Sequence, residues 1–484
     1  MLLGATRPAG TDVIEVRDPE DGSLVGTVPR ATLHDLDHAL DRAVEGSRIS
    51  RALPVHERVS ILRAAAEIVM DRREAFAETI AREGIKTIRE ARREVLRCAE
   101  TLRISAEEAR RVTGETIAFD QRPGSEDRVG YWIREPVGVI AAITPFNDPL
   151  NLVAHKVGPA IASGNAIIVK PHSATPLSAL GLADALLSAG LPPTILQIIT
   201  GRGEEIGDAL VADRRVSMVS FTGGPAVGDR LVARAGRKKI ALELGANSPN
   251  IVLHDADLDA AADAIVDGAF GAAGQNCLHV QRVIVERAVE GPLTEALVSR
   301  TSRLRRGPKL DEATDLGPLI SRAAADRVRA VIADATLGSG QMVAGGAGDG
   351  TFVEPTLVRE VPLGSRLARE EVFGPVTGIF AVDSLDEAIR LANAADQALH
   401  AAVFTNDIRS AMRVVREVAA GGVIVNDSSD YRIDAMPFGG VKGSGMGREG
   451  VAHAIAEMTT TKVVCLNLTP ARDGEQPVER SGPS

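Results

Sequence analysis

Three polar residues in separate stretches of the chain could carry out covalent chemistry on a carbonyl carbon. Cys277, at the end of the run GQNC, is one of only three cysteines among 484 residues. Glu243 ends the apolar run IALE, and Asn147 follows the apolar run VGVIAAITPF. A thiol nucleophile, a carboxylate base and an amide donor are the parts needed to oxidise an aldehyde through a covalent thioester. We therefore expect these three side chains to meet in the folded chain.

Each of these residues also has an ordinary structural interpretation. A lone cysteine is more often an inert buried side chain than a nucleophile, a glutamate at a strand end is usually solvated, and Asn-Asp-Pro favours a turn. Cys277 differs from a core residue because Gly271, Gly274 and a polar Gln-Asn pair precede it. Glycines let the backbone approach a substrate, and the N–H of Cys277 could then face a developing oxyanion. This context favours the nucleophile interpretation.

Glycine-rich turns follow several apolar runs. SFTGGPAVG joins an expected strand to an expected helix, where a pyrophosphate can lie at the helix N-terminus. The run departs from the G-x-G-x-x-G fingerprint, and such turns are common without ligands. Gly201-Arg202-Gly203, followed by Gly207, gives a similar weak signal. Lys170-Pro171-His172-Ser173 ends another strand, and either a charged strand exit or a contact to a nucleotide ribose would account for it.

The elements that must position these residues alternate in type. Residues 44–113 repeat apolar side chains at helical spacing, and residues 114–136 break that rhythm with turn residues, as a hairpin would. Short β-branched runs then alternate with helical segments in two cycles, as far as the run GGVIVNDSS. This alternation predicts an α/β fold with largely parallel sheets and ligands at the carboxyl ends of the strands.

Length and composition limit the class of protein. A chain of 484 residues predicts about two or three domains. The net charge of −10 argues against a nucleic acid or an anionic membrane as partner. Three scattered cysteines and nine histidines without ligand spacing predict neither disulfides nor a metal site. No run resembles a secretory signal or a membrane span, so we expect a cytoplasmic protein. The polar run 469–484 should fray or lie on a neighbouring subunit.

The motifs, in this order, resemble those of the aldehyde dehydrogenase superfamily. The resemblance covers about residues 10–468 and rests on EPVGVIAAITPFNDPLNLVAHKVGPAIASGNAIIVKP, FTGGPAVG, LELGANSPN, GQNC, EEVFGPV and PFGGVKGSGMGREG. It implies a Rossmann-like cofactor domain (1–115 and 136–244), an α/β catalytic domain (245–445) and a small β oligomerisation element (116–135 and 446–484). It also implies NAD or NADP as cofactor, a small-molecule aldehyde as substrate, and a homodimer or homotetramer.

The resemblance also implies roles for individual residues. Cys277 would be the nucleophile, Glu243 the base and Asn147 the oxyanion donor, while Lys156 and Glu449 match positions proposed in relatives to relay protons. Lys170 would hold a cofactor ribose, Gly223 and Gly224 would border the pyrophosphate, and Glu371 and Phe373 would position the nicotinamide ribose and ring. The full set of expected cofactor contacts is Thr144, Pro145, Lys170, His172, Ser173, Gly203, Gly207, Phe221, Thr222, Gly223, Gly224, Val227, Leu244, Gly245, Glu371 and Phe373.

Two departures from the family pattern concern the cofactor side. Ser173 stands where many NAD-specific relatives carry a glutamate that would bind the ribose 2′-hydroxyl and repel a 2′-phosphate. Serine removes this repulsion, and Lys170 adds positive charge, so we hypothesise that NADP is accepted and even preferred. Ala246-Asn247 replaces a frequent Gly-Lys, and we have no interpretation of that change.

The substrate is less constrained by the sequence. The expected pocket residues are Arg97, Asp148, Asn151, His155, Asn276, Leu278, Tyr431 and Arg432. The two arginines are about equally well explained by structural salt bridges and by recognition of an anion. The functional hypothesis is a small polar or anionic aldehyde: a hydroxyaldehyde, a semialdehyde, or a phosphonate- or sulfonate-bearing aldehyde. A CoA-acylating enzyme, disfavoured by Glu243, and a catalytically silent binding protein are the alternatives.

Overall fold

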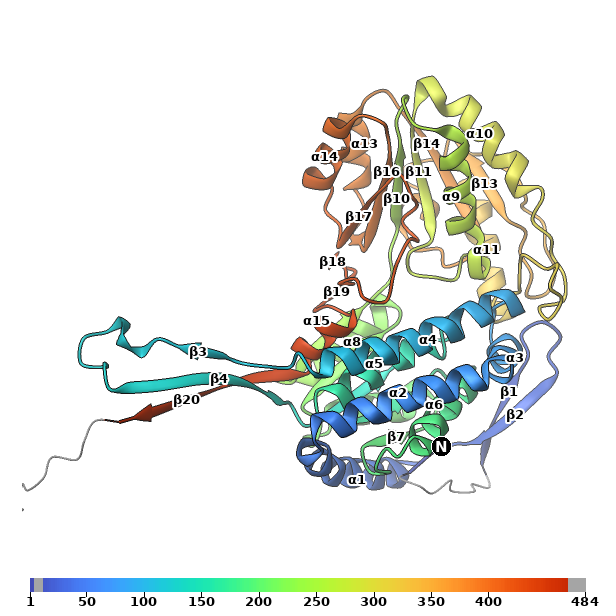
Figure 1. The fold of residues 1–484 in the computed structure, drawn as a ribbon. Coiled ribbons are helices and arrows are strands. Elements are labelled where there is room, and N and C mark those ends of the chain that lie inside the picture. The colour runs from blue at the N-terminus through green and yellow to red at the C-terminus, as the bar shows by residue number, and fades with distance from the viewer. Residues whose placement is uncertain (4–11, 469–484) are drawn as a thin grey trace, which may run out of the picture.

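The structure, a computed structural model, describes residues 1–3 and 12–468. The expected fraying of the tail, 469–484, concerns residues outside this range. Two α/β lobes lie one above the other in Figure 1, and a long β arm projects from the lower lobe. The predicted α/β class with largely parallel sheets is confirmed. No helix within the described ranges is both long and apolar enough to cross a bilayer.

The lower lobe is built on a six-stranded sheet of order β19-β9-β8-β5-β6-β7. Its strands are β5 (Val139–Ile143), β6 (Ala166–Lys170), β7 (Leu196–Ile198), β8 (Met218–Thr222), β9 (Lys239–Glu243) and β19 (Gly445–Met446). All run parallel except β19. The chain moves outward from β5 to β7 and then returns to the other side of β5 with β8. A reversal of this kind opens a crevice at the carboxyl ends of the central strands.

Helices cover both faces of this sheet because successive strand residues point to opposite sides. Ile140 and Ala142 of β5 pack with α2 (Val55–Asp71), α3 (Arg73–Glu83), α4 (Ile88–Ala109), α5 (Asn151–Ala162) and α6 (Leu177–Ser188). Val139 and Ala141 pack with α1 (Leu33–Ala52), α7 (Asp208–Ala212) and α8 (Pro225–Ala235). The sheet is therefore buried on both faces, and ligands can reach it at the carboxyl ends of its strands.

The upper lobe contains a seven-stranded sheet of order β12-β13-β14-β11-β10-β16-β17, in which only the edge strand β12 is antiparallel. Its strands are β10 (Ser248–Val252), β11 (Val280–Glu286), β12 (Gln341–Ala344), β13 (Thr356–Arg359), β14 (Val376–Val382), β16 (His400–Phe404) and β17 (Gly422–Val425). One face packs on α9 (Leu258–Phe270), α10 (Arg287–Thr301) and α11 (Arg322–Ala335), and the other on α13 (Leu385–Ala392) and α14 (Ile408–Glu417).

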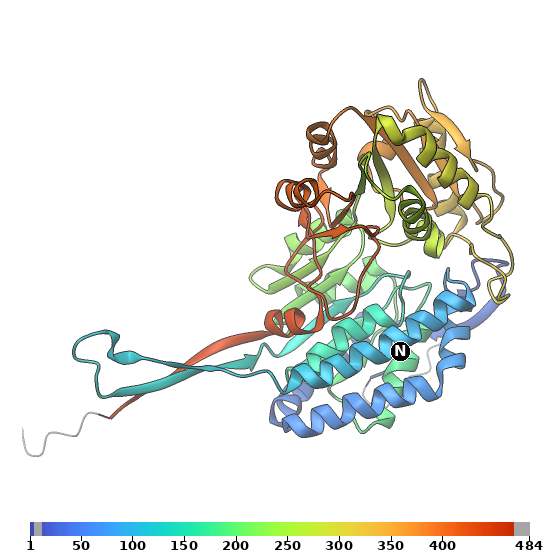
Figure 2. The same ribbon diagram turned by 45° about the horizontal axis from the view of Figure 1, so that its top comes forward.

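The arm is a three-stranded antiparallel sheet of order β20-β4-β3. β3 (Glu115–Ile117) and β4 (Arg128–Pro136) come from the middle of the chain, and β20 (Thr459–Asn467) comes from its end. Figure 2 shows that the arm stays clear of both lobes. The domain boundary predicted at 445/446 assigns residues 446–457 to this element, whereas β19 pairs with β9 and α15 (Val451–Glu457) packs against the core of the lower lobe.

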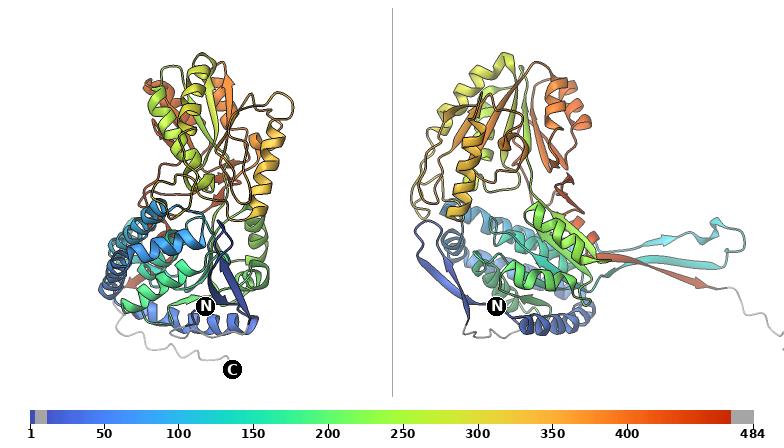
Figure 3. Two further views of the ribbon diagram at one scale, coloured as in Figure 1. Left: turned by 90° about the vertical axis from the view of Figure 1, so that its right-hand side faces the viewer. Right: turned by 180° about the vertical axis from the view of Figure 1, so that it is seen from behind.

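A second hairpin, β1 (Val13–Arg17) and β2 (Leu24–Pro29), reaches from the lower lobe to the upper one, as the views in Figure 3 show. Lys309 of the upper lobe is ion-paired with Asp18 at the hairpin tip (2.6 Å), and its Nζ donates to the Gly84 carbonyl beyond α3 (2.8 Å). Thr351 donates to the Pro19 carbonyl (2.8 Å). These contacts tie the two lobes together on the side away from the arm and so fix the width of the space between them.

Candidate active site

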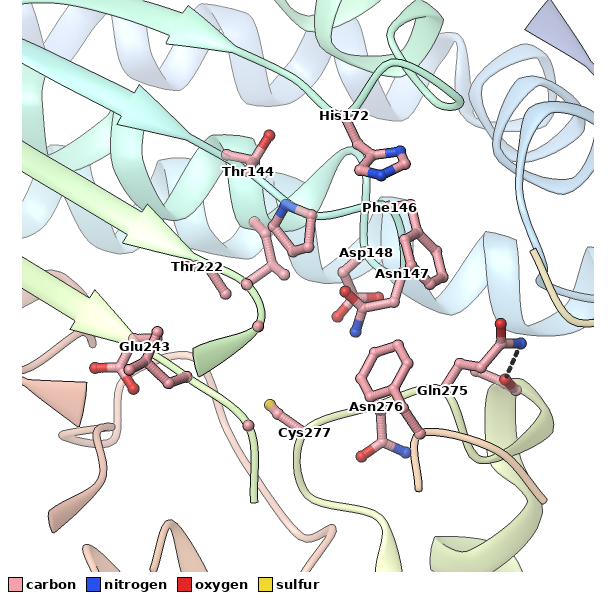
Figure 4. Close-up of a pocket in the computed structure, with 18 of the residues that line it drawn as sticks. Thr144, Phe146, Asn147, Asp148, His172, Thr222, Glu243, Gln275, Asn276 and Cys277 are labelled. Carbon is pink, nitrogen blue, oxygen red and sulfur yellow. Dashed lines mark hydrogen bonds between the residues drawn. The ribbon is translucent and has the colours of Figure 1, made fainter. Parts of the chain in front are cut away.

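A cavity of about 1000 Å³ lies between the two lobes, where the carboxyl ends of β5, β6, β8 and β9 face the loop after α9. The three residues expected to do chemistry, Cys277, Glu243 and Asn147, all line it. In Figure 4 the Cys277 sulfur lies between the Glu243 side and the Asn147 side of the opening. Three residues from separate stretches of the chain are therefore brought to one cavity, as the sequence predicted.

The loop that carries Cys277 has an unusual backbone. Ala272 and Ala273 have φ values of 51° and 52°, and Gly274 follows at 67°. Left-handed conformations at two consecutive alanines cost free energy and persist only where surrounding contacts hold them. A Cβ at Gly274 would lie 2.3 Å from the Gly374 carbonyl oxygen, so this glycine permits the loop to press against the EVFGPV segment. Gln275 anchors the turn because its Nε2 donates to the Pro318 carbonyl (3.1 Å).

Cys277 is half-buried, and burial raises the pKa of its thiol to about 12. Arg432 opposes this shift, while the Glu371, Glu243 and Asp430 carboxylates add to it. The resting side chain is consequently a thiol near neutral pH, and a base must take its proton before the sulfur can attack.

Glu243 is 3% exposed, and both of its carboxyl oxygens lack a hydrogen-bond partner. Burial, reinforced by the nearby Glu449 carboxylate, raises the pKa of Glu243 well above its usual value. In Figure 4 the carboxyl group is turned away from Cys277. Its Oε1 would lie 2.8 Å from a Cβ at Gly439, so the glycine leaves room on that side. The side chain must rotate to reach a group bound to the sulfur.

Lys156 and Glu449 lie behind Glu243 and do not line the cavity. Lys156 Nζ is 2.7 Å from Glu449 Oε1 and also donates to Ser220 (3.1 Å). Although burial opposes ionisation, Lys156 holds the pKa of Glu449 down at about 2. Glu449 Oε2 has no partner. The ion pair thus keeps Glu449 ionised, and the negative charge of Glu449 adds to the burial that raises the pKa of Glu243.

Asn147 is 7% exposed and lies in the turn between β5 and α5. Glu94 of α4 holds this turn in place. Its Oε1 accepts hydrogen bonds from the N–H groups of Leu150 (2.8 Å) and Asn151 (3.0 Å). A carboxylate from another helix therefore caps α5 and fixes the segment that presents Asn147.

The cofactor half of the cavity is lined by strand ends and glycines. Of the expected cofactor contacts, fifteen line the cavity: Thr144, Pro145, Lys170, His172, Ser173, Gly203, Phe221, Thr222, Gly223, Gly224, Val227, Leu244, Gly245, Glu371 and Phe373. Gly207 does not. It is buried at the end of a single π-helical turn, Gly203–Gly207, where a Cβ would lie 3.8 Å from Ile143 Cδ1.

The residues present fit a dinucleotide. No atom lies within 4 Å of the position that a Cβ would take at Gly203 or Gly224, so the backbone at the α8 N-terminus is open to a phosphate group. Thr144 Oγ1 is buried without a partner. Glu371, whose Oε1 accepts from Ala246 N–H (3.0 Å), has a pKa raised by burial to about 7 and can accept from sugar hydroxyls. Burial also lowers the pKa of Lys170 to about 8.

Aromatic rings connect the two halves. Phe146 makes edge-to-face contacts with His172 (centroids 5.3 Å apart) and with Phe373 (5.7 Å). Phe373 has a φ of 51°, which is rare for a bulky residue and indicates that the backbone is held there by its surroundings. Sequence reasoning missed Phe146, although its position directly before Asn147 in the turn could have suggested it.

The substrate half is rich in charge, and most of that charge is internally paired. Lys86 is ion-paired with Glu94 (2.9 Å) and with Asp148. Arg97, for which a structural salt bridge and recognition of an anion were equally good explanations, pairs with Asp434 (2.9 Å) and Asp148 (3.4 Å). The salt-bridge alternative therefore holds for Arg97, since both of its carboxylate neighbours already use its charge. Asp148, Asn276 and Leu278 line the cavity as expected.

Three of the expected pocket residues lie elsewhere. Asn151 and His155 are buried behind the wall and both bind Asp434 Oδ1 (3.2 and 2.8 Å). They are drawn inward because the Asp434 carboxylate needs partners away from water. Tyr431 is 49% exposed and does not line the cavity.

Arg432 behaves differently from Arg97. It lines the cavity, its guanidinium carbon lies 3.7 Å from the centroid of the Phe438 ring, and its Nε and Nη2 atoms are shielded from solvent without a hydrogen-bond partner. A guanidinium that lines a cavity and lacks an acceptor is suited to bind an anion.

Several further lining residues were not expected from the sequence. They are Lys86, Glu90, Arg93, Glu94, Phe146, Arg202, Glu204, Arg230, Asp267, Arg327, Asp430 and Phe438. Most are charged residues on helices or loops, where charge usually means a solvated surface, so no sequence signal separated them from other surface charges.

The comparisons agree with this geometry. The family model "Aldehyde dehydrogenase family" matches residues 6–464. The chain is 48% identical to aspartate-semialdehyde dehydrogenase 1 of Pseudomonas canavaninivorans, over 94% of this chain and 97% of the relative.

Two solved structures are also similar. Aldehyde dehydrogenase 21 from Physcomitrella patens, in complex with the reaction product succinate, superposes with a TM-score of 0.94 at 35% identity, over 97% of this chain and 98% of that one. Glyceraldehyde-3-phosphate dehydrogenase from Methanocaldococcus jannaschii, complexed with NADP, gives 0.90 at 38% identity, over 94% of this chain and 99% of that one. With the match of the family model, these likenesses show that the chain belongs to the aldehyde dehydrogenase family of NAD(P)-dependent oxidoreductases.

Proposed function

We propose that this enzyme oxidises a small anionic aldehyde to its carboxylic acid, with Cys277 as nucleophile, and accepts NADP. The observation that carries the proposal is the unpartnered Arg432 guanidinium in the same cavity as Cys277, Asn147 and Glu243. Cys277, Asn147 and Glu243 account for the chemistry, and Arg432 accounts for the charge of the substrate.

The first part of the reaction forms a bond to sulfur. A water molecule takes the proton of the Cys277 thiol, the sulfur adds to the aldehyde carbon, and the carbonyl oxygen becomes an oxyanion. The Asn147 amide and the Cys277 N–H donate hydrogen bonds to this oxyanion, each worth about 3–4 kcal/mol in comparable sites. The nicotinamide, when bound, supplies the acceptor for the hydride whose loss leaves an acyl thioester on Cys277.

The second part breaks the same bond. Glu243 rotates toward the sulfur and takes a proton from a water molecule, whose oxygen attacks the thioester carbon. The carbon–sulfur bond then breaks, the acid departs and Cys277 recovers its thiol. A carboxyl group whose pKa is raised by burial is a suitable base near neutral pH. The proton that Glu243 takes from water then passes to the departing sulfur, which restores the Cys277 thiol.

The preference for NADP rests on what surrounds Ser173. Ser173 and Lys170 line the cofactor half together with the guanidinium-bearing Arg202 and Arg230. A hydroxyl and several cations favour a 2′-phosphate, although Glu204 also lies on this wall and weakens the positive potential. The solved relative in complex with NADP supports the binding of this cofactor.

A self-associated enzyme is part of the proposal. Val129, Val463 and Leu466 on the arm are each more than half exposed, which is unfavourable unless another surface covers them. We propose a homodimer or homotetramer in which a second copy covers the arm.

An aldehyde panel tests the function. Butanal and succinic semialdehyde differ only in the terminal carboxylate, and each is assayed with NAD and NADP by absorbance of the reduced nicotinamide. We expect kcat/KM to be at least about tenfold higher for the anionic aldehyde, with the free acid as product whether or not CoA is present. Equal values for the two aldehydes would refute the anionic substrate, and acyl-CoA as product would refute hydrolysis by Glu243.

A further inference from the structure

Two glutamates of α4, Glu90 and Glu94, line the cavity one helical turn apart. Residues spaced by four positions share one face of a helix, with their Cβ atoms about 5–6 Å apart. Each carboxylate accepts a hydrogen bond from the backbone of a different loop of the site. Glu94 binds the turn that presents Asn147, in the lower lobe. The contact of Glu90 is with the upper lobe.

Glu90 reaches from the lower lobe to the loop that carries Cys277. Its Oε1 accepts a hydrogen bond from the Ala272 N–H (2.7 Å), upstream of the nucleophile. Ala272 is the first of the two alanines whose left-handed backbone costs free energy. Glu90 therefore supplies one of the contacts that hold this conformation, and Gln275 supplies another through the Pro318 carbonyl.

Glu90 also has a structural role at the start of α4. Its Oε2 accepts from the N–H (2.8 Å) and the hydroxyl (3.0 Å) of Thr87 in a capping box. This cap uses one carboxylate oxygen, and the other oxygen binds Ala272. At the start of α1 the shorter aspartate makes the same kind of capping box, between Thr32 and Asp35. The length of the Glu90 side chain is therefore needed for the contact with Ala272 and not for the cap.

The two contacts matter together because the donors to the oxyanion come from different lobes. Asn147 follows a strand of the lower sheet, while the N–H of Cys277 precedes a strand of the upper one. The distance between these donors depends on how the two loops are held at the cavity. An α-helix has a fixed rise, so two carboxylates on one face of it fix the spacing of the loops that they bind. A misplacement of about 1 Å can lower a reaction rate by about 100-fold.

We propose that Glu90 is a positioning residue that sets the place of Cys277 relative to Asn147. It acts through the Ala272 N–H, while Glu94 holds the Asn147 turn from the same helix. This inference rests on the roles proposed for Cys277 and Asn147. Glu90 takes no part in bond making. Its effect belongs to the step that forms the oxyanion and not to the affinity for the cofactor.

Two variants separate this role from the helix cap. Glu90→Asp keeps a carboxylate for the cap but loses the reach to Ala272, so it should lower the rate of cofactor reduction in the first turnover by roughly 10- to 100-fold, with little change in melting temperature. Thr87→Ala loses the cap hydroxyl but leaves the Ala272 contact, so it should lower the melting temperature and keep that rate within about twofold. Both are measured with full-length enzyme, saturating NADP and the better substrate of butanal and succinic semialdehyde. The affinity for NADP should stay unchanged in both.

A double-variant cycle with Asn147→Ala tests whether the effect passes through the oxyanion donor. Alone, Asn147→Ala should lower the first-turnover rate by roughly 10²- to 10³-fold. In that background Glu90→Asp should cost less than about threefold, because the spacing that it disturbs no longer matters. Losses that multiply, an unchanged rate in Glu90→Asp, or an equal loss in Thr87→Ala would each overturn the inference and leave the proposed oxidation standing. A wild-type rate in Asn147→Ala would remove the proposed oxyanion donor and the inference together.

Discussion

The two halves of the cavity are built on different physical principles. The cofactor half is formed by the carboxyl ends of parallel strands, with backbone groups and glycines at the surface beside charged side chains such as Lys170 and Arg202. The substrate half is formed by α4, α9 and the loop after β17, which contribute charged side chains, most of them paired. The first half suits a ligand shared by a whole family, because backbone geometry follows from topology. The second can change its ligand by exchanging a few side chains.

Cys277 lies where the two halves meet, and its removal should have the largest effect. Cys277→Ala should lower kcat for aldehyde oxidation by on the order of 10⁴-fold or more, because no other side chain of the site supplies a thiol. Binding of NADP, measured by calorimetry, should persist, since the cofactor half is untouched. Cys465→Ser, at an exposed cysteine of β20, is the control and should retain full activity. Activity in Cys277→Ala would mean that the chemistry belongs to another residue.

Glu243 lies at a strand end in the cofactor half but acts on the substrate. Its loss should have the next largest effect. Glu243→Gln should lower steady-state turnover by roughly 10²- to 10⁴-fold while a first burst of reduced cofactor remains. In the wild type, turnover should rise with pH through the raised pKa of Glu243, because only the ionised carboxylate accepts a proton. Glu449, with a pKa of about 2, stays ionised and cannot cause this rise. An unchanged pH profile in Glu243→Gln would contradict the assignment.

Arg97 and Arg432 both lie in the substrate half, but Arg97 is paired and Arg432 is not. Arg432→Met should raise KM for succinic semialdehyde by about 10- to 100-fold and leave butanal almost unaffected, because it removes a free charge. Arg97→Met breaks pairs with Asp434 and Asp148, so it should lower thermal stability and raise KM for both aldehydes alike. The two variants are compared by KM ratios and melting temperatures. The reverse pattern would show that Arg97, not Arg432, meets the substrate.

Ser173 offers the smallest expected effect, confined to the cofactor half. Ser173→Glu should lower kcat/KM for NADP by roughly tenfold relative to NAD, because a carboxylate would face the 2′-phosphate. The aldehyde KM should stay constant. A variant that still prefers NADP would place the 2′-phosphate elsewhere on this wall.

The sequence predicted the cofactor half better than the substrate half, for a physical reason. Lys170, Thr222 and Glu243 end strands of a parallel sheet, and the alternation of strands and helices already places such residues on one edge. Gly207 does not line the cavity, and the π-helical turn that buries it has no sequence signature. The left-handed alanines before Cys277 are likewise set by tertiary contacts and not by their own preference.

The charges of the substrate half illustrate what the sequence leaves open. Arg97 and Arg432 are the same residue type, and only the fold decides that Asp434 reaches the first and not the second. Asn151 and His155 were both expected in the pocket, yet both turn inward to Asp434. Pairing between distant charges depends on distances that periodicity does not encode.

The most direct test of the account is to trap the acyl enzyme. Glu243→Gln is mixed with succinic semialdehyde and NADP, quenched with acid and examined by intact-protein and peptide mass spectrometry. The account predicts a mass increase equal to one succinyl group, located on Cys277 and absent without NADP. Glu243→Gln protein that has reduced NADP but carries no acyl group on Cys277, or carries it on another residue, would contradict the account.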